Sequence, residues 1–164
     1  MKYLLPILLI VFISCGNAEE GMKNLDGTIL KCKSYEKKYL SIRGKNVTRK
    51  TEPYETWVHY MFGKEELYNV YLPQNQIKLK RSSVGNYRQD IETISVYSRG
   101  NTYYLYRKDL SLVHNRGSIN EKTLNSYEVK TFFNCELLES YQEIEKHYEE
   151  EINKRKEIIR NNKI

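Results

Sequence analysis

Apolar and polar side chains alternate over most of residues 28–136, in short runs that are separated by polar turns. Leu30 and Cys32 alternate with lysines, and the run from Tyr127 to Cys135 alternates in the same way. A period of two residues is typical of β-strands that bury one face. The pattern therefore predicts a mainly β fold, a single antiparallel meander of about eight strands that forms a barrel or a sandwich.

The middle of this β domain is predicted in more detail from shorter patterns. Residues 56–62 are apolar on both faces, which is typical of a central strand. Tyr68, Val70 and Leu72 are expected to form the next row that faces inward. The remaining segments are assigned as a strand over 77–80 and as polar loops over 44–53, 81–90 and 115–125.

The period changes near residue 137, where apolar residues begin to recur at helical spacing. The apolar positions are Leu137, Tyr141, Ile144, Tyr148, Ile152 and Ile159. Glutamates gather near the start of this segment and basic residues near its end, as the helix dipole favours. Residues 137–164 therefore predict an amphipathic α-helix, whose apolar stripe packs on the barrel, dimerises or faces a protein partner.

The first residues have the pattern of an export signal. Lys2 precedes an apolar run over 4–14, and the chain turns polar directly afterwards. A membrane-spanning helix needs about 20 apolar residues, so this run fits a signal peptide instead. We expect the mature protein to lie in the periplasm or outside the cell.

Two cleavage sites fit this signal. Phe12-Ile13-Ser14-Cys15 resembles a bacterial lipobox, which implies cleavage before Cys15 and a lipid anchor on that residue. Cleavage after Ala18 would instead release a soluble periplasmic or secreted protein. The predicted organisation is a signal peptide over 1–14 or 1–18, a tether over 15–27, a β domain over 28–136 and a helix over 137–164.

The three cysteines also bear on the mature protein. When Cys15 is lipidated or removed, Cys32 and Cys135 remain as an even pair in an exported chain. Such a pair predicts a disulfide bond, which would clasp the first strand of the β domain to the last.

Candidate chemistry is sparse. The chain contains no Gly-x-Ser-x-Gly motif, and its three histidines lack metal-ligand spacing. We therefore predict no catalytic, cofactor or metal site. The net charge of +6 fits a lysine-rich surface that faces water, and it would also suit anionic lipid heads or an acidic partner. Residues 103–108 mix tyrosines with basic residues, but they alternate like a strand, and export argues against a nucleic-acid partner.

Two resemblances extend this interpretation. Tyr104–Leu112, with Trp57 and the two cysteines, resembles a pattern in small exported bacterial β proteins of unknown function, which implies a fold only. Residues 83–87 and 134–137 are similar to the inhibitory loop and closing cysteine of the membrane-bound lysozyme-inhibitor family. That resemblance implies an inhibitory loop formed by Ser82, Ser83, Gly85 and Tyr87.

The leading hypothesis is an exported, non-catalytic lipoprotein that acts as a binding or structural module, with a partner on the 137–164 helix. One alternative is a lysozyme inhibitor. Another alternative is a carrier of a lipid or small ligand in a cavity lined by the inward rows. A solid core of Trp57, Phe62, Val70 and Leu105 would exclude the carrier.

Overall fold

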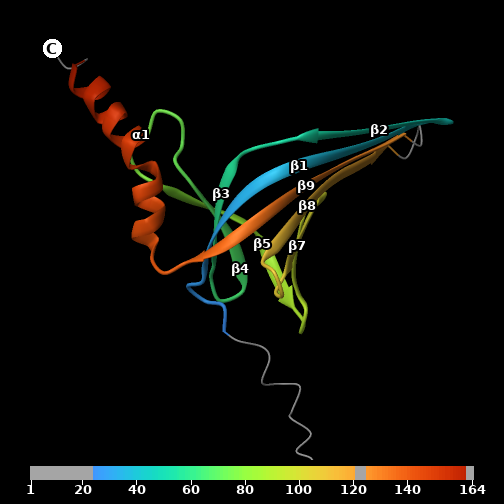
Figure 1. The fold of residues 1–164 in the computed structure, drawn as a ribbon, viewed down its shortest axis with the longest axis horizontal. Coiled ribbons are helices and arrows are strands. Elements are labelled where there is room, and N and C mark those ends of the chain that lie inside the picture. The colour runs from blue at the N-terminus through green and yellow to red at the C-terminus, as the bar shows by residue number, and fades with distance from the viewer. Residues whose placement is uncertain (1–23, 121–124, 162–164) are drawn as a thin grey trace, which may run out of the picture.

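A computed structural model describes residues 24–120 and 125–161 of the 164-residue chain (Figure 1). The strands are β1 (Ile29–Arg43), β2 (Asn46–Pro53), β3 (Trp57–Phe62), β4 (Glu66–Tyr71), β5 (Lys80–Gln89), β6 (Thr93–Ser98), β7 (Asn101–Tyr106), β8 (Ser111–Asn120) and β9 (Asn125–Leu138), and the helix is α1 (Tyr141–Asn161). β1 pairs with β3 on one side and with β9 on the other, so eight strands close into an antiparallel barrel. The predicted fold class is confirmed, and the barrel rather than the sandwich is observed.

β1 and β9 are much longer than most of the other strands and project beyond the barrel. They pair with each other from Ile29↔Leu138 to Ile42↔Ser126, with one register shift between Ser34 and Glu36. β2 pairs with the far half of β1, and the far end of β8 pairs with β9. These four strand ends form a projection (residues 36–53, 117–120 and 125–131), which we call the arm (Figure 1).

One end of the barrel, where the turn over 63–65 joins β3 to β4, is filled by side chains. We call it the closed end. Leu25 packs against the interior cluster there, and the Gly27 amide donates a hydrogen bond to the Phe62 carbonyl (2.8 Å). The Tyr87 ring packs edge-on against Phe62, with centroids 5.3 Å apart. The interior cluster contains Leu30, Cys32, Tyr60, Phe62, Leu67, Ile94, Val96, Leu105, Leu112 and Phe133.

The disulfide bond between Cys32 and Cys135 joins the two strands that close the barrel. The two residues are direct cross-strand partners in β1 and β9. The predicted disulfide is therefore confirmed, and it fixes the seam between the first and last strands of the barrel.

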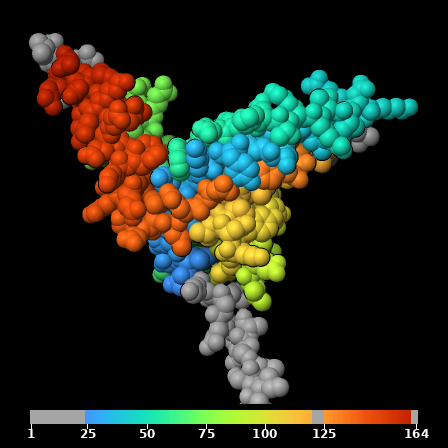
Figure 2. Space-filling view, viewed as in Figure 1, coloured from blue at the N-terminus to red at the C-terminus, as the bar shows by residue number. Residues whose placement is uncertain are grey.

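Helix α1 packs on the outside of the barrel with its first half. Ile144 is fully buried, in a cluster with Ile29 and Val70. Farther along, the Arg155 guanidinium donates hydrogen bonds to the carbonyls of Pro73 (2.6 Å) and Gln76 (2.8 Å). The helix and the arm then extend from the barrel in different directions (Figure 2). Of the three predicted roles for the apolar stripe, packing on the chain's own barrel is observed.

The C-terminal boundary differs from the prediction. β9 continues to Leu138, so α1 begins at Tyr141 rather than at residue 137. Glu143 fixes this start, because its Oε1 accepts hydrogen bonds from the amides of Glu139 (2.8 Å) and Ser140 (3.1 Å). Within the described residues, no helix combines the length and the apolar character that crossing a bilayer requires.

Three predicted loops and one predicted strand are wrong. Residues 46–53, 80–89 and 111–120 are strands, whereas residues 77–79 lie in the connection between β4 and β5. The loops were predicted from polar composition, but the arm and much of β5 are exposed to water and need few apolar residues. Leu79 is apolar because it packs against the cluster around Ile144.

Two of the four expected core residues face outward. Phe62 and Leu105 lie in the interior cluster, but Val70 is buried beneath α1 and Trp57 is 41% exposed. Tyr68 and Val70 were expected to face inward, whereas Leu67 and Asn69 do so. The cause is α1: a strand covered by a helix is apolar on its outer face too, so alternation alone does not identify the inner face.

Candidate functional site: the open end of the barrel

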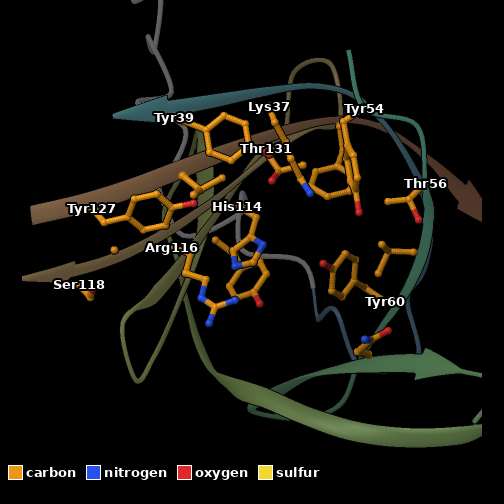
Figure 3. Close-up of a pocket in the computed structure, with 16 residues that line it drawn as sticks. Lys37, Tyr39, Tyr54, Thr56, Tyr60, His114, Arg116, Ser118, Tyr127 and Thr131 are labelled. Carbon is orange, nitrogen blue, oxygen red and sulfur yellow. The ribbon is translucent and has the colours of Figure 1, made fainter. Parts of the chain in front are cut away.

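The opposite end of the barrel, which we call the open end, holds a cavity of about 730 Å³. The arm continues the barrel wall past the other strands, so the cavity lies between the arm and the barrel interior. Figure 3 shows the labelled side chains around one common space. The interior is therefore packed at the closed end and hollow at the open end.

The register of three neighbouring strands sets one wall of the cavity. Lys37 of β1 lies opposite Thr131 of β9, which lies opposite His114 of β8. Two residues farther along, Tyr39, Val129 and Arg116 form the next row. All six line the cavity, because side chains two residues apart on a strand share a face.

Tyrosine is the main aromatic residue of the cavity. The tyrosines that line it are Tyr39, Tyr54, Tyr60, Tyr103 and Tyr127. Tyr103 stacks on His114, with ring centroids 4.2 Å apart and planes 4° apart. His114 Nε2 lies 2.9 Å from Asn101 Oδ1. Burial, with a smaller effect from Arg116 and Lys37, lowers the pKa of His114 to about 4, so this imidazole is neutral at neutral pH.

The inner part of the cavity contains one polar atom that has no hydrogen-bond partner among the described residues. Tyr60 and Asn69 are cross-strand partners in β3 and β4, and both line the cavity. Asn69 Oδ1 is buried and has no hydrogen-bond partner among the described residues. A buried acceptor of this kind is costly unless a ligand or water satisfies it.

The charged groups of the cavity are basic. Lys37 and Arg116 line it, and the Lys37 ammonium lies 3.1 Å from the centroid of the Tyr54 ring. No carboxylate is among the described residues that line the cavity. The nearby Glu52 accepts a hydrogen bond from the Tyr39 hydroxyl (2.5 Å) and pairs with Lys50 (2.5 Å). That hydrogen bond raises the pKa of Tyr39 to about 12.

No protein-family model, curated protein or solved structure matches this chain. The functional argument therefore rests on the chemistry of the cavity and of the surfaces around it.

A second cluster of titratable groups lies between β3 and α1. His59 is fully buried, and its ring lies 4.9 Å from that of His147 and 5.5 Å from that of Tyr148. Neither ring nitrogen of His59 has a partner among the described residues. Burial, followed by His147 and Lys31, lowers the pKa of His59 to about 4. We interpret this cluster as the contact that seats α1 on the barrel.

The described residues contain no group of three or more histidine, cysteine or acidic side chains arranged to hold a metal ion. The histidine cluster between β3 and α1 combines two imidazoles with tyrosine, tryptophan and lysine side chains. Its chemistry is thus that of a packed contact between a helix and a sheet.

The residues predicted to form an inhibitory loop lie instead on β5. Ser82 and Ser83 pair with β4. Gly85 has a φ of +151°, and a side chain does not fit there because its Cβ would lie 2.9 Å from the Tyr97 carbonyl oxygen. The Tyr87 hydroxyl donates to the carbonyls of Gly63 (3.1 Å) and Lys64 (2.8 Å) at the closed end. None of these four residues lines the cavity, and the predicted lipidation site Cys15 lies outside the described residues.

The sequence contains one signal for the cavity, on β9. Tyr127, Val129 and Thr131 share the inward alternation of Phe133 and Cys135, so the inward face changes from apolar to mixed along this strand. On β1 the register shift between Ser34 and Glu36 moves the inward positions from Leu30 and Cys32 to Lys37 and Tyr39, so simple alternation does not identify them.

Proposed function

We propose that this protein is an exported, non-catalytic binding protein that holds a small ligand in the open end of its barrel. The observation that carries the proposal is the cavity of about 730 Å³, whose size is that of a typical small-molecule site. Its wall combines tyrosine rings with Lys37, Arg116 and the unpaired Asn69 oxygen. A ligand with an anionic group would complement the two cations.

Binding is favoured over catalysis by the chemistry of the lining. His114 is neutral at neutral pH, and the cavity has no carboxylate beside it among the described lining residues. Three tyrosines of this region have a raised pKa. The hydrogen bond to Glu52 raises the pKa of Tyr39, and burial raises the pKa of Tyr60 and Tyr103. Neutral tyrosines and a neutral histidine form hydrogen bonds well, but a general base needs a pKa nearer neutrality.

The position of the first described residues supports a tethered orientation. Leu25 and Gly27 contact the closed end, so a lipid anchor on Cys15 would attach the barrel by that end. The cavity would then open away from the anchoring membrane. Mass spectrometry of the native protein tests the anchor: we expect an acylated N-terminal Cys15, and an unmodified N-terminus at Glu19 would contradict it.

The lysozyme-inhibitor alternative has less support, because it needs a protruding loop and its four residues lie in the wall strand β5. The cavity is the better supported site.

Binding of the anionic fluorescent probe anilinonaphthalene sulfonate tests the proposed function. We expect saturable fluorescence enhancement by the folded protein, weakened in Ser118→Trp, whose indole would occupy part of the cavity. The matched control is Ser126→Trp on β9, because Ser118 lines the cavity while Ser126 pairs with Ile119 on the other face of the arm. Equal binding by both variants and the parent protein would refute binding in the cavity.

A further inference from the structure

We infer that the ligand of the open end is a hydroxyl-rich anion of the acidic-saccharide class; this inference rests on the proposed function. Three features of the cavity carry it: an amide oxygen with no partner among the described residues, rings with both apolar faces and hydroxyl groups, and two cations with no carboxylate among the described lining residues. Each feature separates such a ligand from the acyl chain that a lipid carrier would hold.

The inner part of the cavity favours a ligand that donates hydrogen bonds. Asn69 Oδ1 is an acceptor with no partner among the described residues, and Tyr60 lies beside it in the pairing of β3 with β4. The oxygen itself is covered, but the Asn69 side chain lines the cavity, so a rotation of its amide would turn it toward a ligand. A sugar hydroxyl would then supply the missing donor, which an acyl chain lacks.

The walls offer the two kinds of contact that a sugar ring needs. Tyr39, Tyr103 and Tyr127, which are at least partly exposed, present ring surfaces for the C–H faces of a pyranose. Hydroxyl groups of Thr56, Thr131 and Ser118 line the same space. This mixture differs from the closed end, where the interior is almost entirely aliphatic and aromatic.

The charges favour an acidic sugar over a neutral one. Lys37 and Arg116 lie on β1 and β8, on opposite sides of β9, in adjacent rows of the wall. The guanidinium fork of Arg116 suits a carboxylate with two oxygens. Glu52 binds Tyr39 and Lys50 and also interacts with the charge of Lys37, so it offsets part of that charge. Glu128 pairs with Lys130 and is not among the described lining residues, so Arg116 is the main anion-binding group of the site.

The arm gives the site more length than one sugar needs. Tyr39 and Tyr127 lie on the arm, and both line the cavity. The same recognition chemistry therefore fits a free acidic sugar or the end of an acidic polysaccharide, and a comparison of one with three sugar units distinguishes them.

Calorimetric titration of the full mature protein, with its disulfide oxidised, tests the inference. The probes are galacturonate, trigalacturonate, neutral galactose and decanoate. We expect galacturonate to bind at least tenfold more tightly than galactose, because a charged hydrogen bond is lost with the neutral sugar. A further gain for trigalacturonate indicates a polysaccharide, equal affinity indicates a free sugar, and either result supports the class.

Variants assign the contacts. Arg116→Gln should lower the affinity for galacturonate by roughly tenfold and leave the affinity for galactose unchanged. Asn69→Leu should lower the affinity for both sugars. The control is Arg81→Gln, since Arg81 lies outside the cavity, over the Tyr141 ring. Ser118→Trp should weaken the binding of both sugars, because its indole would occupy part of the cavity.

The outcomes separate this inference from the proposed function. If decanoate binds in a manner sensitive to Ser118→Trp and the sugars do not, the cavity is a lipid site and the acidic-saccharide inference is overturned. If the sugars bind equally well to Ser118→Trp, the inference is also overturned. If none of the probes binds, including anilinonaphthalene sulfonate, both the inference and the proposed function are overturned.

Discussion

The two ends of the barrel are built from the same strands but have opposite interiors. β1 contributes Leu30 and Cys32 to the packed closed end and, a few residues later, Lys37 and Tyr39 to the cavity. The closed end excludes water with aliphatic side chains and the Phe62 ring, whereas the open end exposes hydroxyl groups and cations. Stability and binding are thus assigned to different lengths of one strand, so that changes at one end should leave the other largely intact.

The seam between β1 and β9 should give the largest effect, because both ends depend on it. Replacing Cys32 and Cys135 by serine removes a cross-link with a sequence separation of 103. We expect the free energy of unfolding to fall by about 4–5 kcal/mol, since the unfolded chain regains the freedom of a long loop. Chemical denaturation measures this loss, and reduction of the parent protein should reproduce it. A loss below about 1 kcal/mol would show that closure does not depend on the disulfide.

The closed end should be the next most sensitive region. Phe62 is 2% exposed, and Phe62→Ala should lower the free energy of unfolding by about 3–5 kcal/mol through lost burial and a new cavity. Binding of anilinonaphthalene sulfonate at the open end should survive in the protein that remains folded. A loss of binding without loss of folding would couple the two ends and contradict their separation.

Acid should destabilise the protein through histidines that are neutral when folded. The pKa of His59 falls from 6.5 to about 4, so the unfolded chain binds more protons between these values. The contribution of His59 to the free energy of unfolding should therefore be fully present above pH 6.5. It should decrease as the pH falls toward 4, by up to about 3 kcal/mol.

Thermal unfolding measured across this pH range checks the acid effect. His59→Gln should flatten the dependence, whereas His147→Gln should flatten it less, because His147 is less deeply buried and its pKa is lowered mainly by weaker desolvation. An unchanged slope in His59→Gln would place the acid-sensitive group elsewhere.

The open end should show the smallest effect on stability. Tyr127 is 44% exposed, so Tyr127→Ala should change the free energy of unfolding by less than about 1 kcal/mol. The same substitution should weaken binding of anilinonaphthalene sulfonate, since the ring lines the cavity. Tyr97→Ala is a suitable control, because Tyr97 is exposed on β6 and lies outside the lining. A stability loss as large as that of Phe62→Ala would mean that the open end is part of the core.

The sequence predicted the antiparallel β domain, the helix and the disulfide, because each depends on a local period or on a count of cysteines; it left the choice between barrel and sandwich open. It did not predict the arm, because both faces of β2 and of the far end of β8 are largely exposed to solvent, so these strands resemble loops in composition. It also placed Val70 inside, because α1 covers the outer face of β4 and makes that face apolar as well.

Most of the cavity depends on the register between strands, which the pattern of a single strand does not reveal. Lys37, Thr131 and His114 lie far apart in the chain and become neighbours only when β1 closes onto β9. The unpaired Asn69 oxygen likewise has no signature in the sequence, since an asparagine in a strand is equally able to face water. Ser82 and Gly85 were predicted to lie in an inhibitory loop because of a family resemblance, yet they belong to the wall strand β5.

Fluorine NMR of the protein labelled with fluorotyrosine tests the central claim, that the open end is the binding end, most directly. In a titration with anilinonaphthalene sulfonate, we expect saturable shifts for Tyr60, Tyr103 and Tyr127, assigned by tyrosine-to-phenylalanine variants. Tyr87 at the closed end and Tyr148 beneath α1 should not shift. Saturable shifts of Tyr87 or Tyr148 with none at the three cavity tyrosines would contradict the account.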